Sequence, residues 1–512
     1  MKILIRSTQT KQEVAFQPGE TVFDAMLRSD LAPNSYCGGK GTCGKCKVRW
    51  VQKGEEYLAC QLPAEEGMVI ETVAKDDMEV LAQSMEKAFV LNPVVEGDRK
   101  GVGVGVAVDI GTTTMVGYLL DLTTGQELAV TSMANPQRVY GADVISRIAY
   151  TQANPDGIVK LQKVLVEALN SMVIDLCKTS DRSQGDVHAM TIAGNTVMLH
   201  TLLGVSAVSI ANAPFEPVFS DQKTLHPREL EIDINDQGRI FTLPCVSGYV
   251  GADIIAGLLA CDLELQDSYG LLIDIGTNGE IVLGKKDRML ACSTAAGPAF
   301  EGANISMGMA GVRGALSSFR LQEGEPIYET IGGTTPLGIC GSGLMDIMAE
   351  LLKHGFVDPS GAFAAPEGLA DWKQEMLTTT SAMPAFMVTK AGINLTQRDV
   401  REVQLAKGAL RAGVFTLLKE AGITADQVGR VYLAGGFGNF VDVHNACILG
   451  LIPAELEARV IKIGNGAGLG AKLSLLDKGQ LARATTLKQQ IQYIELSTRS
   501  DFQELFMEAM FF

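Results

Sequence analysis

The sequence predicts two structural units of different class, a small α+β domain at the N-terminus and a two-lobed α/β body behind it. Three observations lead to this prediction. Short strands and one short helix fill residues 1–75, and apolar strands alternate with helical stretches from residue 103 onward. A strand that ends in Asp-Ile-Gly occurs twice in the body, 165 residues apart. A chain of 512 residues is also too long for one ordinary domain.

These patterns divide the chain into four segments. Residues 1–75 form the small domain, and residues 76–102 form a linker that is charged, weakly periodic and closed by GDRKG. The first lobe of the body is expected over residues 103–265. The second lobe and a C-terminal segment are expected over residues 266–512.

Composition narrows the classes of function. The formal net charge is −16, and residues 1–75 hold ten Lys and Arg against nine Asp and Glu, so the excess negative charge lies in the body. An acidic body argues against nucleic acid as a partner, because phosphate binding needs a basic surface. No apolar run is long enough for a membrane helix or a signal peptide. We therefore expect a cytoplasmic protein with no membrane partner, whose ten cysteines are metal ligands or core residues rather than disulfides.

The small domain reads as a strand-rich unit. KILIRS and EVAFQ are short strands separated by polar residues, and VRWVQ is a third strand. TVFDAMLRSD places Val22, Phe23, Met26 and Leu27 at helical spacing, which predicts a short helix. Between this helix and the third strand lies a loop rich in glycine and cysteine.

The cysteine loop predicts a 2Fe–2S cluster. Its spacing is C-x5-C-x2-C-x13-C, and the four ligands would be Cys37, Cys43, Cys46 and Cys60. Thiolates are the ligands of iron–sulfur clusters, and neighbouring glycines let the backbone approach the sulfides. A zinc site with four thiolates is the alternative, and unmetallated thiols are a third. Zinc ribbons usually present two C-x2-C knuckles and this chain has one, which favours iron. The other six cysteines are scattered singly in apolar surroundings and are expected in the core.

The body contains predicted strands at VGVAVDIG, HAMTIAG, YGLLIDIG and RVYLAGG. Helices are predicted over residues 158–178 and 399–420. Asp109 and Asp274 each end an apolar strand and precede a glycine turn. Exposed N–H groups in such turns bind phosphate oxygens, and the carboxylate positions Mg²⁺ or its waters. One such turn is weak evidence, but two similar copies favour a nucleotide site over purely structural turns. The phosphate-binding candidates are Gly111, Thr112, Thr113, Gly276, Thr277, Asn278 and Gly279.

A third glycine segment follows the strand RVYLAGG. Gly435, Gly436 and Gly438 would let the backbone lie against adenosine. GNGAGLGA at 464–471 is expected to open a helix that packs on the opposite lobe. The order of two phosphate turns and one adenosine loop resembles the actin, Hsp70 and sugar-kinase (ASKHA) superfamily. GADIIAGLLACDL at 251–263 resembles the interlobe helix of that superfamily.

The whole chain is similar to the reductive activators of corrinoid-dependent enzymes. Besides the CGGKGTCGKC loop, the similar stretches are 106–114, 135–148, 193–198, 273–280, 297–305, 338–344 and 433–438. The resemblance implies a β-grasp domain of the plant-type ferredoxin class joined to an ASKHA body. It implies an enzyme, an ATP-hydrolysing iron–sulfur reductase that returns inactive Co(II) corrinoid protein to Co(I) for a methyltransferase system.

The resemblance also implies partners and roles. The partners are the corrinoid protein and a low-potential electron donor, and we expect a homodimer. The cofactors are the 2Fe–2S cluster, ATP and Mg²⁺. Asp109 and Asp274 would position Mg²⁺, and Glu280 or Glu301 would orient the attacking water, although both glutamates are equally typical of solvated loops. Plant-type clusters lie near −400 mV, and a one-electron gap of roughly 200 mV costs about 5 kcal/mol, within reach of ATP.

Two other functions fit part of the pattern. A sugar or acid kinase with an accessory cluster would explain the nucleotide turns, but a kinase needs no electron. A redox-sensing regulator, in which the cluster gates nucleotide binding, would need a DNA-binding module or a basic helix, and the sequence contains neither.

Overall fold

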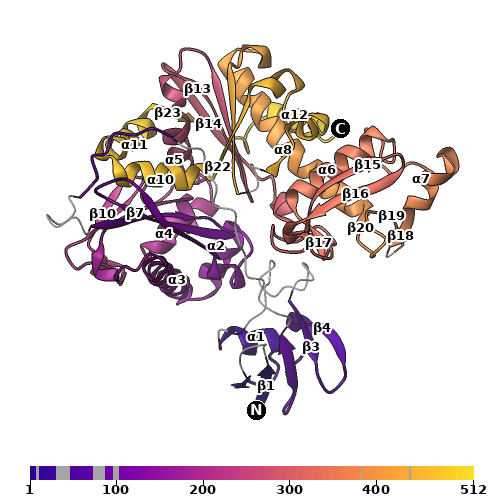
Figure 1. Cartoon of the computed structure of the whole chain (residues 1–512), viewed down its shortest axis with the longest axis horizontal. Coiled ribbons are helices and arrows are strands. Elements are labelled where there is room, and N and C mark those ends of the chain that lie inside the picture. The colour runs from indigo at the N-terminus through magenta and orange to yellow at the C-terminus, as the bar shows by residue number, and fades with distance from the viewer. Residues whose placement is uncertain are drawn as a thin grey trace.

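The computed structural model of the chain describes residues 1–6, 11–29, 31, 46–72, 87–95, 103–380, 382–436 and 440–512 (Figure 1). The strands in these ranges form five sheets. Within the same ranges, no helix combines the length and the apolar character that are needed to traverse a bilayer. The proposed segment boundaries after residues 75, 102 and 265 stay a prediction.

The N-terminal domain is a β-grasp unit, as the sequence predicts. Its sheet has the order β2-β1-β5-β3-β4, with β1 antiparallel to β2 and parallel to β5. Helix α1 begins at a capping box in which Thr21 and Asp24 satisfy each other's backbone N–H groups. Phe23 and Met26 of α1 pack against the sheet in a hydrophobic core that belongs to this domain alone. The bounds are β1 (Lys2–Arg6), β2 (Lys11–Ala15), α1 (Val22–Leu27), β3 (Lys47–Trp50), β4 (Glu55–Leu58) and β5 (Val69–Thr72).

The first lobe contains a six-stranded sheet of order β10-β11-β9-β6-β7-β8. Strands β6, β7 and β8 form an antiparallel meander, and β9 and β11 continue the sheet in parallel with β6. Helix α3 packs on β7 and β8, whereas α10 packs on β6 and β9 and α5 packs on β9 (Figure 1). The bounds are β6 (Val104–Ile110), β7 (Thr114–Asp121), β8 (Glu127–Ala134), α2 (Val144–Ala153), α3 (Gly157–Thr179), β9 (Val187–Gly194), α4 (Thr196–Leu202), β10 (Lys223–Leu225), β11 (Arg239–Thr242) and α5 (Ala252–Cys261).

The second lobe repeats this plan. Its sheet has the order β22-β21-β12-β13-β14-β23, with an antiparallel meander from β12 to β14 and with β21 parallel to β12. The repeat accounts for the duplicated Asp-Ile-Gly motif, because β6 and β12 hold the same position in their sheets. The bounds are β12 (Gly270–Ile275), β13 (Gly279–Lys285), β14 (Arg288–Thr294), α8 (Gln397–Ala421), β21 (Arg430–Ala434), α9 (Val443–Ile448), β22 (Val460–Gly464), α10 (Gly466–Leu476), α11 (Lys478–Gln490), β23 (Ile491–Tyr493) and α12 (Ser500–Ala509).

Two small sheets extend the second lobe at the right of Figure 1. One has the order β16-β15-β17 and packs against α6, and the other has the order β18-β19-β20. No helix or strand is predicted here from the sequence. The bounds are β15 (Ala315–Gln322), β16 (Glu325–Thr330), β17 (Gly338–Ile339), α6 (Gly341–Lys353), α7 (Asp371–Met376), β18 (Leu377–Thr380), β19 (Met383–Met387) and β20 (Asn394–Thr396).

Helices α5 and α10 form the layer between the two large sheets. A Cβ atom on Gly470 of α10 would lie 2.1 Å from the carbonyl oxygen of Ala256 in α5, so only glycine permits this approach. Helix α10 follows β22 of the second sheet but packs on the first sheet, as the glycine pattern predicts. The first-lobe core continues past both helices onto Leu272 and Tyr432 of the second sheet.

Candidate functional site

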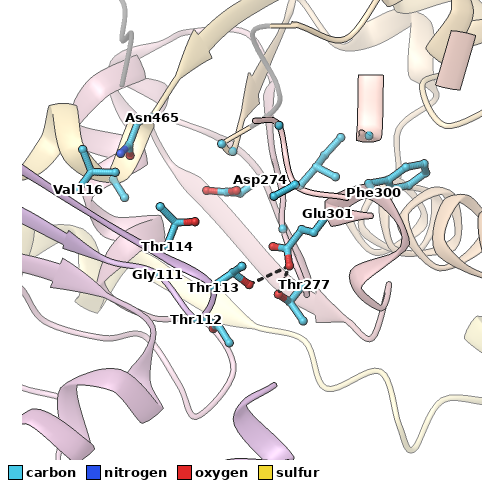
Figure 2. A pocket seen from close by; sticks show the side chains of 18 of the residues that line it. Gly111, Thr112, Thr113, Thr114, Val116, Asp274, Thr277, Phe300, Glu301 and Asn465 are labelled. Carbon is cyan, nitrogen blue, oxygen red and sulfur yellow. Dashed lines mark hydrogen bonds between the residues drawn. The ribbon is translucent and has the colours of Figure 1, made fainter. Parts of the chain in front are cut away.

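A cavity of about 370 Å³ lies where the carboxyl ends of the central strands of both large sheets converge (Figure 2). The turns after β6 and β12 form two of its walls, and the segments after β21 and β22 form a third. The start of α5, the short 3-10 helix η7 (Pro298–Glu301), and residues 309–312 and 340–342 also line it. Loops at the carboxyl ends of strands are the usual ligand sites of such α/β sheets.

The first turn connects β6 to β7. A Cβ atom on Gly111 would lie 2.4 Å from the carbonyl oxygen of Thr114, so the turn closes this tightly only with glycine. Two buried side chains hold its backbone from behind. Asn135 Nδ2 donates a hydrogen bond to the carbonyl oxygen of Gly111 at 2.8 Å, and Arg147 donates one to that of Thr112. The turn is therefore braced in a shape that leaves its threonine hydroxyls at the cavity.

The second turn connects β12 to β13 and is closed by a hydrogen bond from the Gly276 N–H to the Asn278 carbonyl oxygen at 3.0 Å. Gly276, Thr277 and Asn278 line the cavity, as the sequence predicts for phosphate ligands. Gly279 instead begins β13, where a Cβ atom would lie 2.2 Å from Leu410 Cδ2 of α8. Helix packing therefore explains the glycine at position 279.

Glu301 connects the two turns across the cavity. The hydroxyls of Thr113 and Thr277 each donate a hydrogen bond of 2.9 Å to Glu301 Oε2 (Figure 2). Burial raises the pKa of Glu301, and these two hydrogen bonds oppose the increase. One carboxylate of η7 thus holds a hydroxyl from each lobe.

Half-buried carboxylates gather at the cavity, together with the buried Glu280. Burial raises the pKa of Asp109 to about 8, with a further contribution from the charges of Asp253 and Asp274. Burial raises the pKa of Asp274 to about 7 and that of Asp253 to about 6, and the Asp253 charge adds to the shift of Asp274. The pKa of Glu280 lies well above its ordinary value for the same reason, burial first and neighbouring aspartates second. A cation bound among these groups would favour their ionised forms.

The carboxylates do not form a complete metal cage. In the part of the chain that the structure describes, no group of three or more Asp, Glu, His or Cys side chains is arranged to hold a metal ion. Magnesium usually takes one or two protein carboxylates and completes its shell with water and phosphate oxygens. The donor set therefore fits Mg²⁺ that arrives with a triphosphate.

Three further cavity residues had no role in the sequence analysis. Asp253 lies in the first turn of α5, inside a motif read only as a connecting helix. Asn195 caps α4 and donates a hydrogen bond of 2.8 Å to the Thr112 hydroxyl. Asn465 caps α10 and donates one of 3.3 Å to the Tyr118 hydroxyl. An asparagine immediately before a helix is an N-cap signal, and it could have identified both asparagines.

The third glycine segment closes the cavity on the side of β21. Gly435 has a φ of 109°, and a Cβ atom there would lie 2.4 Å from the Ile275 carbonyl oxygen. A Cβ atom on Gly436 would have no atom within 4 Å, so this position is open. Phe440 also lines the cavity, and Gly438 lies outside the described residues.

We expect Gly435→Ala to destabilise the nucleotide-free protein by about 1–3 kcal/mol, because alanine would be strained at this φ and would collide with Ile275. Thermal and urea unfolding measure the change. Gly436→Ala is the matched control, one residue away without the collision, and should leave stability within about 0.5 kcal/mol of wild type. Equal unfolding curves for the two variants would contradict the strained turn.

The raised pKa values predict a pH dependence of stability. The folded-state pKa values of Asp109 and Asp274, about 8 and about 7, exceed the ordinary unfolded value near 4. The folded protein then holds protons that the unfolded chain has lost, so the stability they contribute is present at low pH and is lost as pH rises through about 8. We expect Tm without nucleotide to fall from about pH 5 to about pH 8, less steeply in Asp274→Asn. Identical slopes for the two proteins, measured by circular dichroism, would rule this out.

The described part of the cysteine loop brings two predicted ligands together. Cys46 precedes β3, Cys60 lies in the 3-10 helix η1 (Ala59–Gln61), and their Sγ atoms are 3.2 Å apart. Two adjacent thiols are suited to bind one iron–sulfur cluster. Cys37 and Cys43 lie outside the described residues. The remaining cysteines are buried or half-buried as predicted, and within the described ranges they form no disulfide: Cys177, Cys245, Cys261, Cys292, Cys340 and Cys447.

Three family models together match most of the chain. Residues 5–65 match the 2Fe–2S iron–sulfur cluster binding domain. Residues 104–266 match the RACo middle region, and residues 268–512 match the C-terminal domain of RACo, the ASKHA domain.

Two curated proteins and one solved structure are similar over most of their length. The corrinoid activation enzyme RamQ of Eubacterium limosum is 33% identical over 97% of this chain and 97% of its own. The reductase of the Co(II) methylated amine-specific corrinoid protein from Methanosarcina barkeri is 25% identical over 79% of this chain and 76% of its own. A solved reductive activator for corrinoid, iron–sulfur protein is 28% identical with a TM-score of 0.76, covering 100% of this chain and 98% of that one.

Proposed function

Because this chain belongs to the family of RACo-type corrinoid activation enzymes, we propose that it is an ATP-dependent reductive activator of a corrinoid protein. One electron converts the substrate, an inactive Co(II) corrinoid, to the Co(I) form that a methyltransferase system uses. The observation that carries the proposal is the combination in one chain of a ferredoxin-type domain with a cavity faced by two Asp-Gly turns. An ordinary kinase has no use for a ferredoxin-type domain.

The cavity residues divide into three groups by chemistry. Asp109 and Asp274 position Mg²⁺, directly or through its waters, and their raised pKa values support this because a cation would relieve the repulsion between buried carboxylates. Gly435 and Gly436 line the adenosine side, and Gly438, which lies outside the described residues, is assigned to the same side from the sequence alone. Phosphate oxygens are bound by the N–H groups, hydroxyls and amide of the two turns, from Gly111, Thr112, Thr113, Gly276, Thr277 and Asn278.

Glu301 or Glu280 orients the water that attacks the terminal phosphate. Both carboxylates lie at the cavity, and burial raises the pKa of each, so each carboxylate, when ionised, is a stronger proton acceptor than an exposed one. Glu301 is the stronger candidate because it already holds Thr113 and Thr277, one from each phosphate turn. Binding of a triphosphate to these hydroxyls would free the carboxylate to hold water instead.

Cys37, Cys43, Cys46 and Cys60 hold the 2Fe–2S cluster, which when bound stores one electron at a time. The 3.2 Å separation of the Cys46 and Cys60 sulfurs supports this ligand set. The sequence places glycines beside these cysteines, and glycines there would allow backbone N–H groups to approach a bound cluster.

The setting of the protein follows from the same reaction. We place it in the cytoplasm, where a reducing environment keeps thiols such as the six scattered cysteines free of disulfides. A low-potential electron donor reduces the N-terminal domain, and the corrinoid protein takes the electron. The working assembly is a homodimer.

The proposal is tested by mixing the reduced protein, Mg²⁺ and ATP with candidate Co(II) corrinoid proteins and following the visible spectrum. We expect the Co(I) absorption to develop with ATP and to be absent with a non-hydrolysable ATP analogue. Phosphate release stimulated by a small hydroxylated compound, with no Co(I) from any corrinoid protein, would favour a kinase instead.

A further inference from the structure

Two helices extend from the nucleotide cavity to the linker. Helix α5 carries Asp253 of the cavity in its first turn, and α10 is capped by Asn465 at the same cavity. The opposite ends of both helices contact residues 87–95, the described part of the linker, which we call the connecting segment. The connecting segment follows the N-terminal domain in the chain. The cavity is therefore joined to the connecting segment through α5 and α10.

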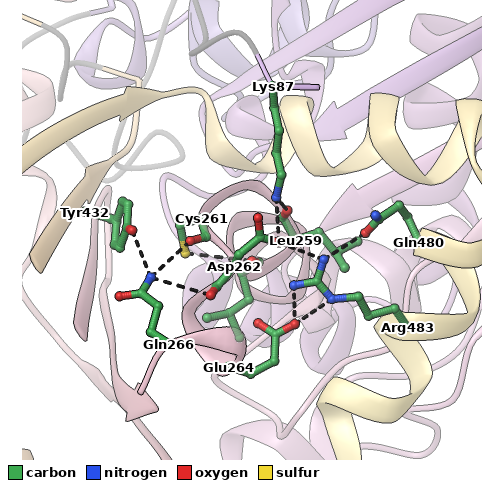
Figure 3. Close-up of polar contacts among 10 residues, drawn as sticks. Lys87, Leu259, Cys261, Asp262, Glu264, Gln266, Tyr432, Gln480 and Arg483 are labelled. Atoms are coloured by element: carbon green, nitrogen blue, oxygen red, sulfur yellow. Dashed lines mark hydrogen bonds and ion pairs between the residues drawn. The ribbon is translucent and has the colours of Figure 1, made fainter. Parts of the chain in front are cut away.

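Lys87 attaches the connecting segment to the end of α5. Its ammonium group lies 2.7 Å from Asp262 Oδ1 and donates a hydrogen bond to the carbonyl oxygen of Leu259 (Figure 3). Asp262 ends α5 in the left-handed conformation, with a φ of 52°, and Arg483 of α11 reaches the same carboxylate oxygen at 2.8 Å. The Lys87 side chain is only 13% exposed, so solvent screens this ion pair weakly.

Backbone hydrogen bonds attach the same segment to the end of α10. The N–H groups of Asn92 and Val94 donate to the carbonyl oxygens of Leu476 and Leu475 at 2.8 and 3.1 Å. The Lys478 N–H returns a bond of 2.8 Å to the Asn92 carbonyl oxygen. The last carbonyls of a helix have no partner within it, so the segment satisfies groups that would otherwise need water.

The two helices can transmit a displacement because they are short and tightly packed. Ten residues of α5 span about 15 Å. The Gly470–Ala256 contact leaves no gap between α5 and α10 in which one helix could move alone. Packed interiors transmit small shifts rather than absorbing them. A shift of Asp253 or Asn465 on nucleotide binding would therefore reach Asp262 and Leu476 at the far ends.

We propose that the connecting segment couples the nucleotide cavity to the N-terminal domain, with Lys87 as the residue that positions it. The segment makes all of these contacts in the structure, so a shift carried along α5 and α10 on nucleotide binding would release it. Release frees the N-terminal domain to approach its partner. This inference rests on the proposed function, since it assigns a purpose to nucleotide binding at that site.

Attachment of the segment and binding of nucleotide must affect each other reciprocally. If nucleotide binding weakens the attachment of the segment, then loss of the attachment must strengthen nucleotide binding by the same factor. Lys87→Met removes the ion pair to Asp262 and keeps most of the side-chain length. Lys488→Met is the matched control, because Lys488 is 19% exposed and pairs with Asp221 without touching the segment.

The experiment is amide hydrogen exchange of the full-length holoprotein with and without Mg²⁺ and a non-hydrolysable ATP analogue. In the wild type and in Lys488→Met, we expect the Asn92 and Val94 amides to exchange about tenfold faster with the analogue. In Lys87→Met, these amides should exchange fast in both conditions. The variant should also bind the analogue about fivefold more tightly, at the low end of typical coupling. Cluster absorption and thermal unfolding check that each variant is folded.

Two results would overturn the coupling. In the first, the analogue protects the Thr277 amide of the wild type but leaves the exchange rates of the Asn92 and Val94 amides unchanged. In the second, these two amides exchange as slowly in Lys87→Met as in the wild type. The corrinoid assay separates this failure from that of the proposed function. Wild-type protein that reduces corrinoid with ATP while the segment stays protected refutes the coupling alone. A segment that responds to nucleotide in a protein that reduces no corrinoid supports the coupling and refutes the function.

Discussion

Asp274→Asn is expected to lower the rate of ATP-dependent corrinoid reduction on the order of a hundredfold or more, and Asp109→Asn should do the same. Each variant removes a carboxylate that faces the cavity from the end of a central strand. A neutral amide of the same shape offers Mg²⁺ no negative charge, so the metal would no longer be positioned at the phosphates. The visible spectrum of the cluster should not change, because its ligands lie in the other domain.

Thermal unfolding distinguishes the loss of the metal site in these variants from a simple loss of folding. Burial disfavours the charged forms of Asp109 and Asp274, so both asparagine variants should unfold at a higher temperature than wild type at about pH 8 without nucleotide. Wild type should gain about 2.7 kcal/mol from Mg²⁺ and ATP at a hundred times Kd, and the variants should gain little.

A matched control for these variants is Asp346→Asn. Asp346 is also a buried carboxylate with a raised pKa, but it lies in α6 and contacts Asn445 rather than the cavity. We expect this variant to reduce corrinoid within a few-fold of wild type. Wild-type rates for both Asp109→Asn and Asp274→Asn would refute the assigned metal site.

Cys60→Ala is expected to remove the cluster and with it all corrinoid reduction, whereas nucleotide binding should persist. Cys60 lies 3.2 Å from Cys46 through their sulfurs, so the variant removes one of two adjacent ligands. Nucleotide binding should survive because the N-terminal domain has its own hydrophobic core and, among the described residues, those that line the cavity all come from the body.

Iron and sulfide analysis, visible absorption and nucleotide titration measure these outcomes. Wild type should contain about two irons and two sulfides per chain. Cys447→Ser provides the control, since this half-buried cysteine of α9 lies in the body and should leave the cluster intact. If the wild type contained zinc and no sulfide, the predicted cluster would be wrong and the cysteines would form a structural zinc site.

The local signals in the sequence predicted the parts of the fold that depend on short stretches of chain. Apolar strands ending in Asp-Ile-Gly predicted β6 and β12 together with their turns, because a buried strand and a glycine turn are encoded by neighbouring residues. The helix predicted at 158–178 is α3 (Gly157–Thr179), within one residue at each end. The two small sheets from β15 to β20 were not predicted, since their strands are short and carry no motif.

The residues of the candidate site also fall into two groups, those predicted from short stretches of chain and those that depend on packing. Asp109, Asp274 and the turn threonines were predicted from their own neighbours in the chain. The predicted Gly279 lies against α8 instead, because the packing of Leu410 on that position depends on a residue more than a hundred positions away. Asp253 was missed for a similar reason, since only the placement of α5 between the sheets brings it to the cavity.

Short stretches of the sequence are enough to predict the chemical groups of this protein: thiolates at cluster spacing, carboxylates at strand ends and glycines in the turns. Which of these groups lie next to one another depends on the packing of the whole fold. The hydrogen bonds of Thr113 and Thr277 to Glu301 span both lobes, and the contact of Lys87 with Asp262 joins the linker to an interlobe helix. Such pairings depend on the packing of sheets and helices around a common core, which no local pattern of residues specifies.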